Sequence, residues 1–163
     1  GKAEVLFSEE NGRFVKYTHW LSNQWIRANG APDIIHWNNG IWDITREPPV
    51  EGCFTPLDEY IHGLARTLST FRAAGVPAIV FATTTYPHPG REEQRAEDID
   101  EYNAAARALM EREGVPVNDL GALIKNRMEY VCEDHLHLTE AGYRACAAMV
   151  VEKLTPYLMS AER

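Results

Sequence analysis

The chain has 163 residues, of which 45% are hydrophobic and 25% are charged, and its formal net charge at pH 7 is −8. These values are typical of one globular domain, here residues 1–163, and exclude a disordered, collagen-like or coiled-coil protein. The excess of acidic residues argues against a nucleic-acid partner. No apolar run approaches the roughly 18 residues that cross a bilayer, so we expect no membrane partner either.

Apolar segments of two kinds alternate along the chain: short runs bounded by turn residues, which predict strands, and longer stretches with helical spacing. In the first half of the chain we expect a strand at 4–7, a helix at 18–28 capped by Thr18, a strand at 33–38 and a helix from Pro56 that closes at Gly75. In the second half we expect a strand at 76–83, a helix at 97–113, a strand at 115–118 and a helix from Thr139. This alternation predicts an α/β fold, a three-layer α/β/α sandwich around a mostly parallel sheet.

Three cysteines, Cys53, Cys132 and Cys146, are scattered along the chain. They form no CxxC pair and the histidines form no HExxH cluster, so the sequence indicates neither a disulfide framework nor a metal site. The phosphate-binding glycine motifs of nucleotide-binding domains are also missing, and we expect no cofactor. Scattered cysteines are typical of a reducing compartment, and we expect a cytoplasmic protein.

The sharpest motif lies in the loop before the last helix, where Asp134 precedes His137 by three residues. A carboxylate placed in this way can accept the Nδ1 proton of the imidazole, which leaves Nε2 to act as a base. This is the base and its orienting acid in a hydrolase with a nucleophilic side chain. The structural alternative is a loop-capping aspartate beside an ordinary surface histidine.

Two further polar loops follow predicted strands, where parallel sheets bind their ligands. Asn38 ends the strand predicted at 33–38, and Asn39 and Gly40 follow it directly. An asparagine amide can donate to an oxyanion, although an Asn-Gly pair is also common in plain turns. Gly12 follows the first predicted strand, and its backbone N–H is a second candidate donor.

Taken in this order, these segments resemble the SGNH hydrolases, the GDSL esterase/lipase family. The run Asp134-His135-Leu136-His137 and the Gly142-Tyr143 pair that follows it look like the last block of the family. Residues 32–43 look like its third block, and Asn11-Gly12 looks like its second. The resemblance covers about residues 5–158 and implies a flavodoxin-like sheet of strand order 2-1-3-4-5.

The chain departs from the family pattern in two places. Its third block reads Gly40-Ile41-Trp42-Asp43, so Trp42 stands where the family usually has its oxyanion asparagine, and either Asn38 or Asn39 could supply the amide instead. The first block, a strand that ends in Gly-Asp-Ser and carries the nucleophile, is missing. Ser8 is the one serine directly after a predicted strand, but it lies where the second block begins.

We expect the missing strand to come from roughly 20–30 residues upstream of Gly1 or from a separate complementing chain. Omission of an interior strand would destabilise the sheet, because each unpaired buried backbone group costs about 1–3 kcal/mol of folding free energy. If an upstream segment exists, a signal peptide ahead of it stays an open alternative to the cytoplasmic location. A direct pairing of residues 4–7 with 33–38 would instead indicate a closed sheet without a nucleophile.

The resemblance implies hydrolysis of acyl esters by a Ser-His-Asp mechanism, with His137 as base, Asp134 as its orienting acid and a serine outside this sequence. The oxyanion and binding groups are then Gly12, Asn38, Asn39, Gly40 and Trp42. We expect a small ester substrate, such as an acetylated carbohydrate, because the chain has no obvious lid. The competing interpretation is a catalytically inactive binding or assembly module on the same scaffold.

Overall fold

A computed structural model describes residues 3–49 and 51–161. Three parallel strands form its sheet in the order β1-β2-β3: β1 (Ile34–Asn38), β2 (Ala78–Ala82) and β3 (Val117–Asn118). In the register, Asn38 faces Ala82 and Ala82 faces Asn118, so all three strands end at one edge. The three strands predicted at 33–38, 76–83 and 115–118 are therefore confirmed, with shorter bounds.

The predicted strand at 4–7 is wrong. This segment has no regular secondary structure, and the side chains of Val5 and Phe7 are each 80% exposed. A strand needs a neighbour for its backbone N–H and C=O groups. Within the described residues β1 pairs with β2 alone, so its other edge carries no strand and residues 4–7 do not close the sheet.

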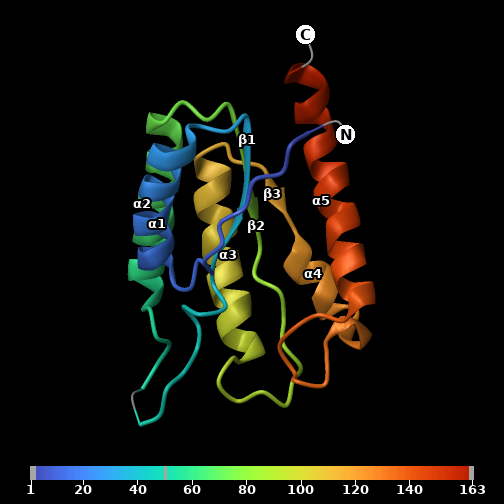
Figure 1. The fold of residues 1–163 in the computed structure, drawn as a ribbon. Coiled ribbons are helices and arrows are strands. Elements are labelled where there is room, and N and C mark those ends of the chain that lie inside the picture. The colour runs from blue at the N-terminus through green and yellow to red at the C-terminus, as the bar shows by residue number, and fades with distance from the viewer. Residues whose placement is uncertain (1–2, 50, 162–163) are drawn as a thin grey trace.

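Helices cover both faces of the sheet (Figure 1). The elements α1 (Val15–Asn29), α2 (Leu57–Ala73) and α3 (Ala96–Arg112) lie on one side, and α4 (Leu120–Lys125) and α5 (Glu140–Ala161) lie on the other. This is the three-layer α/β arrangement expected from the sequence. The short helix α4 and the 3-10 turn η1 (Met128–Tyr130) are additions that the periodicity did not reveal, because six and three residues are too few to show a helical period.

The first helix begins three residues earlier than predicted, at Val15, and Thr18 does not cap it. The Thr18 hydroxyl donates instead to the carbonyl of Gly12 (2.7 Å). The Val15 N–H at the start of α1 is satisfied from a distant loop by both carboxylate oxygens of Asp43 (3.0 and 3.2 Å). A side chain far away in sequence therefore takes the place of the local N-cap.

The main core lies between the sheet and α1, α2 and α3. Trp37 of β1 packs edge-on against Phe71 of α2 and Phe81 of β2, with ring centroids 5.3 and 5.0 Å apart. Helix α5 packs less closely, since its Tyr143 and Val151 are 55% and 65% exposed. Within the described residues, no helix is long and apolar enough to cross a membrane.

Candidate active site

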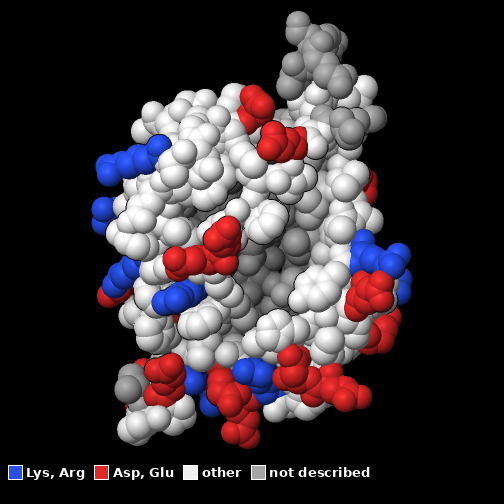
Figure 2. All heavy atoms as spheres, viewed as in Figure 1, with Lys and Arg blue, Asp and Glu red and all other residues white. Residues whose placement is uncertain are grey.

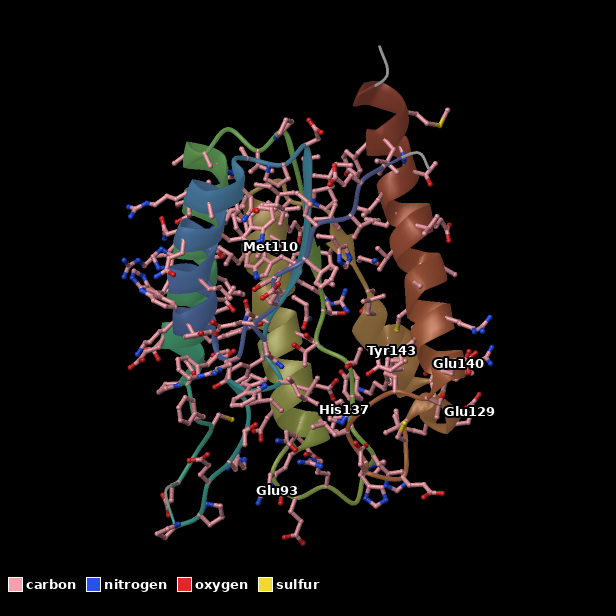
Figure 3. The ribbon with its side chains drawn as sticks, viewed as in Figure 1. Glu93, Met110, Glu129, His137, Glu140 and Tyr143 are labelled. Carbon is pink, nitrogen blue, oxygen red and sulfur yellow. The ribbon has the colours of Figure 1, made fainter. Side chains whose placement is uncertain are left out.

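The loop between η1 and α5 carries Asp134 and His137 at the end of the sheet where the strands finish (Figure 3). His137 Nδ1 lies 2.6 Å from Asp134 Oδ2, and the side chain of His137 is 67% exposed. The other oxygen of Asp134 accepts the backbone N–H groups of Leu136 (3.0 Å) and His137 (2.9 Å). These two bonds and the His137 side chain lower the pKa of Asp134 to about 2, so the carboxylate stays ionised in any neutral or mildly acidic solution.

Backbone bonds close this loop at its base. Val131 and Leu138 form an antiparallel bridge, with Cys132 N–H donating to the His137 carbonyl (2.7 Å). At Gly142 a Cβ would lie 2.7 Å from the backbone oxygen of Tyr130, so only glycine lets α5 begin this close to η1. The glycine of the Gly142-Tyr143 pair therefore has a packing reason.

The loop after β1 holds the two candidate oxyanion asparagines in different environments. Asn39 is buried, with Oδ1 accepting from Trp37 Nε1 (2.8 Å) and Nδ2 donating to Thr18 Oγ1 (2.8 Å). Asn38 is exposed, and its Nδ2 donates to the Ala82 carbonyl (2.8 Å). Because an amide nitrogen carries two hydrogens, Asn38 keeps a second N–H for a ligand, whereas Asn39 is committed to holding the loop.

Gly40 makes the turn that follows. Its φ is +141°, and a Cβ there would lie 2.0 Å from Thr84 Oγ1, which donates to the carbonyl of Asn39 (2.7 Å). Tyr60 OH donates to the same carbonyl (3.0 Å). Gly40 thus lets the backbone approach Thr84, and its role in the turn is structural.

The loop that contains Gly12 lies against this turn, as the sequence suggested. Asn39 Nδ2 is 3.4 Å from the Arg13 carbonyl, and the bond from Val15 N–H to Asp43 joins the same two loops. Burial raises the pKa of Asp43 to about 6, while the bonds from Val15 and Thr55 oppose that rise. Asp43 therefore has a structural role that the sequence motif did not reveal.

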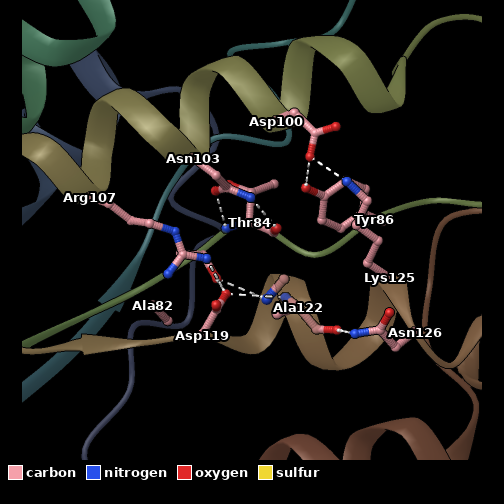
Figure 4. A network of polar contacts seen from close by, with 12 residues as sticks. Ala82, Thr84, Tyr86, Asp100, Asn103, Arg107, Asp119, Ala122, Lys125 and Asn126 are labelled. Atoms are coloured by element: carbon pink, nitrogen blue, oxygen red, sulfur yellow. Dashed lines mark hydrogen bonds and ion pairs between the residues drawn. The ribbon is translucent and has the colours of Figure 1, made fainter.

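A polar network fixes the chain as it leaves β2 (Figure 4). Asn103 of α3 accepts from Thr84 N–H and donates to the Thr84 carbonyl, both at 2.9 Å. Asp119 caps α4 through Ala122 N–H (3.1 Å) and pairs with Arg107 of α3. Thr83 Oγ1 also donates to Asp119 Oδ1 (2.8 Å), so the chain leaving β2 is held by both Asn103 and Asp119 before it reaches the site.

The remaining predicted site residues are placed as follows. Trp42 is 47% exposed in the turn after Gly40, where it offers an apolar surface. The Ser8 hydroxyl accepts from Glu10 N–H (3.2 Å) in the exposed N-terminal segment. Among the residues with described positions, no group of three or more His, Cys, Asp or Glu side chains could hold a metal ion.

A family model described as GDSL-like Lipase/Acylhydrolase matches residues 11–145. The chain belongs to this family. The matched stretch includes Gly12, the turn at Asn38–Gly40 and both Asp134 and His137, so the resemblance seen in the motifs is confirmed at the level of the family. A comparison with curated proteins finds no match.

Solved structures of low sequence identity share the fold of this GDSL-like chain. The lipase/acylhydrolase from Enterococcus faecalis is 19% identical, with a TM-score of 0.74 over 88% of this chain and 71% of that one. A carbohydrate esterase family 3 protein from Talaromyces cellulolyticus is 16% identical, with a TM-score of 0.73 over 93% and 70%. The acetylxylan esterase Axe2 from Geobacillus stearothermophilus is 19% identical, with a TM-score of 0.70 over 88% and 68%.

Sequence reasoning missed the residues that hold the loops of this family member in place. Asn103, Arg107 and Asp119 carry no motif, since their partners lie on other elements. The one local signal was Thr83-Thr84-Thr85, a polar run directly after a buried strand. Hydroxyl groups at that position are well placed to bind neighbouring backbone groups.

Proposed function

We propose that the protein hydrolyses small neutral acyl esters by a Ser-His-Asp mechanism, and that this chain supplies the base, its orienting acid and the oxyanion donors. The contact of 2.6 Å between Asp134 Oδ2 and His137 Nδ1 carries the proposal. A hydrogen bond there fixes Nδ1–H as the donor and leaves Nε2 unprotonated, which is the tautomer that a general base needs. Membership of a family of lipases and acylhydrolases supports the same chemistry.

In the proposed reaction a serine oxygen attacks the ester carbonyl while His137 Nε2 takes the serine proton. The imidazolium that forms is stabilised by the Asp134 carboxylate and then donates its proton to the leaving alcohol. Water hydrolyses the acyl-enzyme by the same proton transfers in the opposite direction. Because Asp134 has a pKa of about 2, it stays an acceptor throughout and never competes for the proton.

For the oxyanion we assign the second amide N–H of Asn38 and the backbone N–H of Gly12. Asn38 is preferred over Asn39 because both groups of the buried Asn39 amide already have partners. One such donor contributes about 2.7–4 kcal/mol to the transition state in other hydrolases. In this proposal Trp42 lines the substrate side of the same turn.

We place the nucleophile on a strand that pairs with the free edge of β1. Along that edge β1 is only half-buried at Ile34 and Ile35, whereas β2 is buried from Ile79 to Ala82. The exposed apolar side chains of Val5, Leu6 and Phe7 form a second surface that such a segment could cover. A preceding part of the same gene product or a separate chain would satisfy the geometry equally.

The net negative charge of the chain favours a neutral substrate. Acidic side chains gather along the lower edge of the surface, the end that carries His137 (Figures 2 and 3). Glu93, Glu129 and Glu140 there are 56%, 63% and 80% exposed. Each of these three glutamates is paired with an arginine (Arg91, Arg127 and Arg144), so the pairs themselves add little net charge. The net charge of −8 over the whole chain would still repel an anionic ester at low salt. An acetylated carbohydrate is neutral, and carbohydrate esterases are among the structural neighbours.

Hydrolysis of p-nitrophenyl acetate tests the proposal. The 163-residue chain should show no rate above background, and a version extended at its N-terminus by an added strand that ends in Gly-Asp-Ser should be active. His137→Ala should abolish that activity, whereas His62→Ala, which changes a histidine on α2, should leave it within twofold. Activity of the short chain that disappears with Ser8→Ala would place the nucleophile elsewhere. An extended protein with no activity on any ester would favour the binding module.

A further inference from the structure

Beyond the dyad itself, we propose that Arg91 is a positioning residue that couples the loop of Asp134 and His137 to the turn after β1. This inference rests on the proposed function for its kinetic consequence, but its structural content stands alone. The guanidinium contacts two segments through different nitrogens. Nη1 donates to the carbonyl of Asp134 (3.1 Å), and Nε donates to Oε1 of Gln94.

On the Asp134 side, a short turn around Arg91 holds two consecutive carbonyl groups. The Asp134 carbonyl accepts from Arg91, and the His135 carbonyl accepts from the backbone N–H of His88 (2.9 Å). The His88 and His135 rings also stack, with centroids 4.5 Å apart and planes at 26°. His135 has a φ of +64°, so the chain turns sharply between the two residues of the dyad.

On the Gln94 side, a chain of hydrogen bonds leads to the turn that contains the oxyanion candidates. Gln94 Nε2 donates to Thr45 Oγ1 (2.9 Å), and Thr45 Oγ1 donates to the carbonyl of Ile41 (2.9 Å). Gln94 is only 6% exposed, so its amide is held in one orientation. These successive bonds connect the Ile41 carbonyl to the Asp134 carbonyl through three side chains.

The planar guanidinium explains why an arginine suits this place. Its Nε–H and Nη1–H groups point in fixed directions within one rigid plane, so the two hydrogen bonds set the angle between the two loops. A lysine has the charge but a single nitrogen on a flexible stem. The nearest carboxylate, Glu93 Oε2, lies 3.9 Å from Arg91 Nε, beyond hydrogen-bond distance, so an ion pair does not account for the geometry.

Amide hydrogen exchange on the 163-residue chain tests the structural part without any need for activity. Leu136 and His137 N–H bond to Asp134, so their exchange reports local opening of this loop. Arg91→Met keeps the aliphatic stem and removes every donor, and should speed both exchange rates about tenfold or more. Arg66→Met on α2 removes the same charge from a helix that lies across the sheet and should change neither rate.

Kinetics of the extended, nucleophile-bearing protein test the catalytic consequence. Arg91→Met should lower kcat about 10–100-fold and leave KM within twofold, because misplacement by about 1 Å costs a factor of that order. The kcat of Arg91→Lys should be as low as that of Arg91→Met to within threefold, since a positive charge alone does not restore the two directed hydrogen bonds. Gln94→Leu should give the same loss, and the double variant should lose no more than either single one.

Three outcomes would overturn the proposal. One is full activity in Arg91→Lys, which would indicate a purely electrostatic role. Another is unprotected amide hydrogen exchange at Leu136 and His137 in the unmodified chain, because Arg91 would then not be holding the loop in one conformation. The third is additive losses in the double variant, which would show that Arg91 and Gln94 act separately. If the extended protein proves inactive, the exchange experiment still decides the structural claim.

Discussion

Replacing the buried Asp43 by asparagine should remove a pH dependence of stability that the structure predicts. The carboxyl group is fully buried, and it accepts the first N–H of α1 from Val15 and a bond from the Thr55 side chain. Asparagine has the same shape, so Oδ1 can accept from Val15 and Nδ2 can donate to the Thr55 hydroxyl. The substitution therefore removes the charge and preserves the contacts.

The magnitude follows from the pKa of Asp43, which burial raises from 3.8 to about 6. Between these values the folded protein binds a proton at Asp43 that the unfolded chain has already released. Stability is therefore lost as the pH rises through this window, by about 3 kcal/mol at roughly 1.4 kcal/mol per pH unit. The loss is complete once the pH exceeds the folded pKa.

Urea unfolding followed by tryptophan fluorescence at pH 4, 5, 6 and 7.5 measures the difference between the two proteins. The Asp43→Asn variant should match the unmodified chain at pH 4 and exceed its unfolding free energy by about 1–3 kcal/mol at pH 7.5. Taking the difference cancels other titrating carboxylates, such as Asp134. Asp33→Asn, at an exposed aspartate, is the control and should show no trend. An Asp43→Asn variant less stable at pH 7.5 would show that the charge stabilises α1 by more than its burial costs.

Two further substitutions probe the turn after β1. Gly40→Ala should cost more than about 2 kcal/mol of unfolding free energy in a urea titration, because its Cβ would meet Thr84; Gly30→Ala, where φ is also positive but the space is open, should cost about 1 kcal/mol. Asn39→Ala should lower stability by at least about 1 kcal/mol, since it leaves the buried Trp37 N–H unpaired. Asn38→Ala should leave stability within about 0.5 kcal/mol and lower kcat of the extended protein about 100-fold; equal stability losses at Asn38 and Asn39 would contradict their different assignments.

The sequence predicted most of the fold because the buried strands and long helices carry their own periodicity. The run at 78–82 is apolar at every position and forms β2, which is buried at every position after Ala78. The apolar triplet Val5-Leu6-Phe7 looks similar locally but forms no strand. What distinguishes the two is a hydrogen-bonding neighbour, and strand pairing is a tertiary property that a short window cannot reveal.

Part of the candidate site was predictable because its residues are close in sequence. Asp134 and His137 lie three residues apart, so one loop brings them together and their spacing alone indicates the contact. Asn38 and Asn39 are adjacent in sequence, yet one is exposed and the other buried. Successive side chains of a strand point to opposite faces, and at its end only the packing of other elements decides which face is solvent.

The bonds that hold this end of the molecule join elements that are already packed on one another. Asp43 fastens the turn after β1 to α1, and Asn103 fastens the loop after β2 to α3. Arg91 then links the Asp134 loop to the turn after β1 through Gln94 and Thr45. Since none of these three links uses the edge of β1 that carries no strand within the described residues, the Asp134–His137 pair, which we propose as base and orienting acid, can form before a nucleophile-bearing strand is added. Addition of that strand would therefore complete a prearranged site, and its effect on activity should far exceed its effect on the geometry of His137.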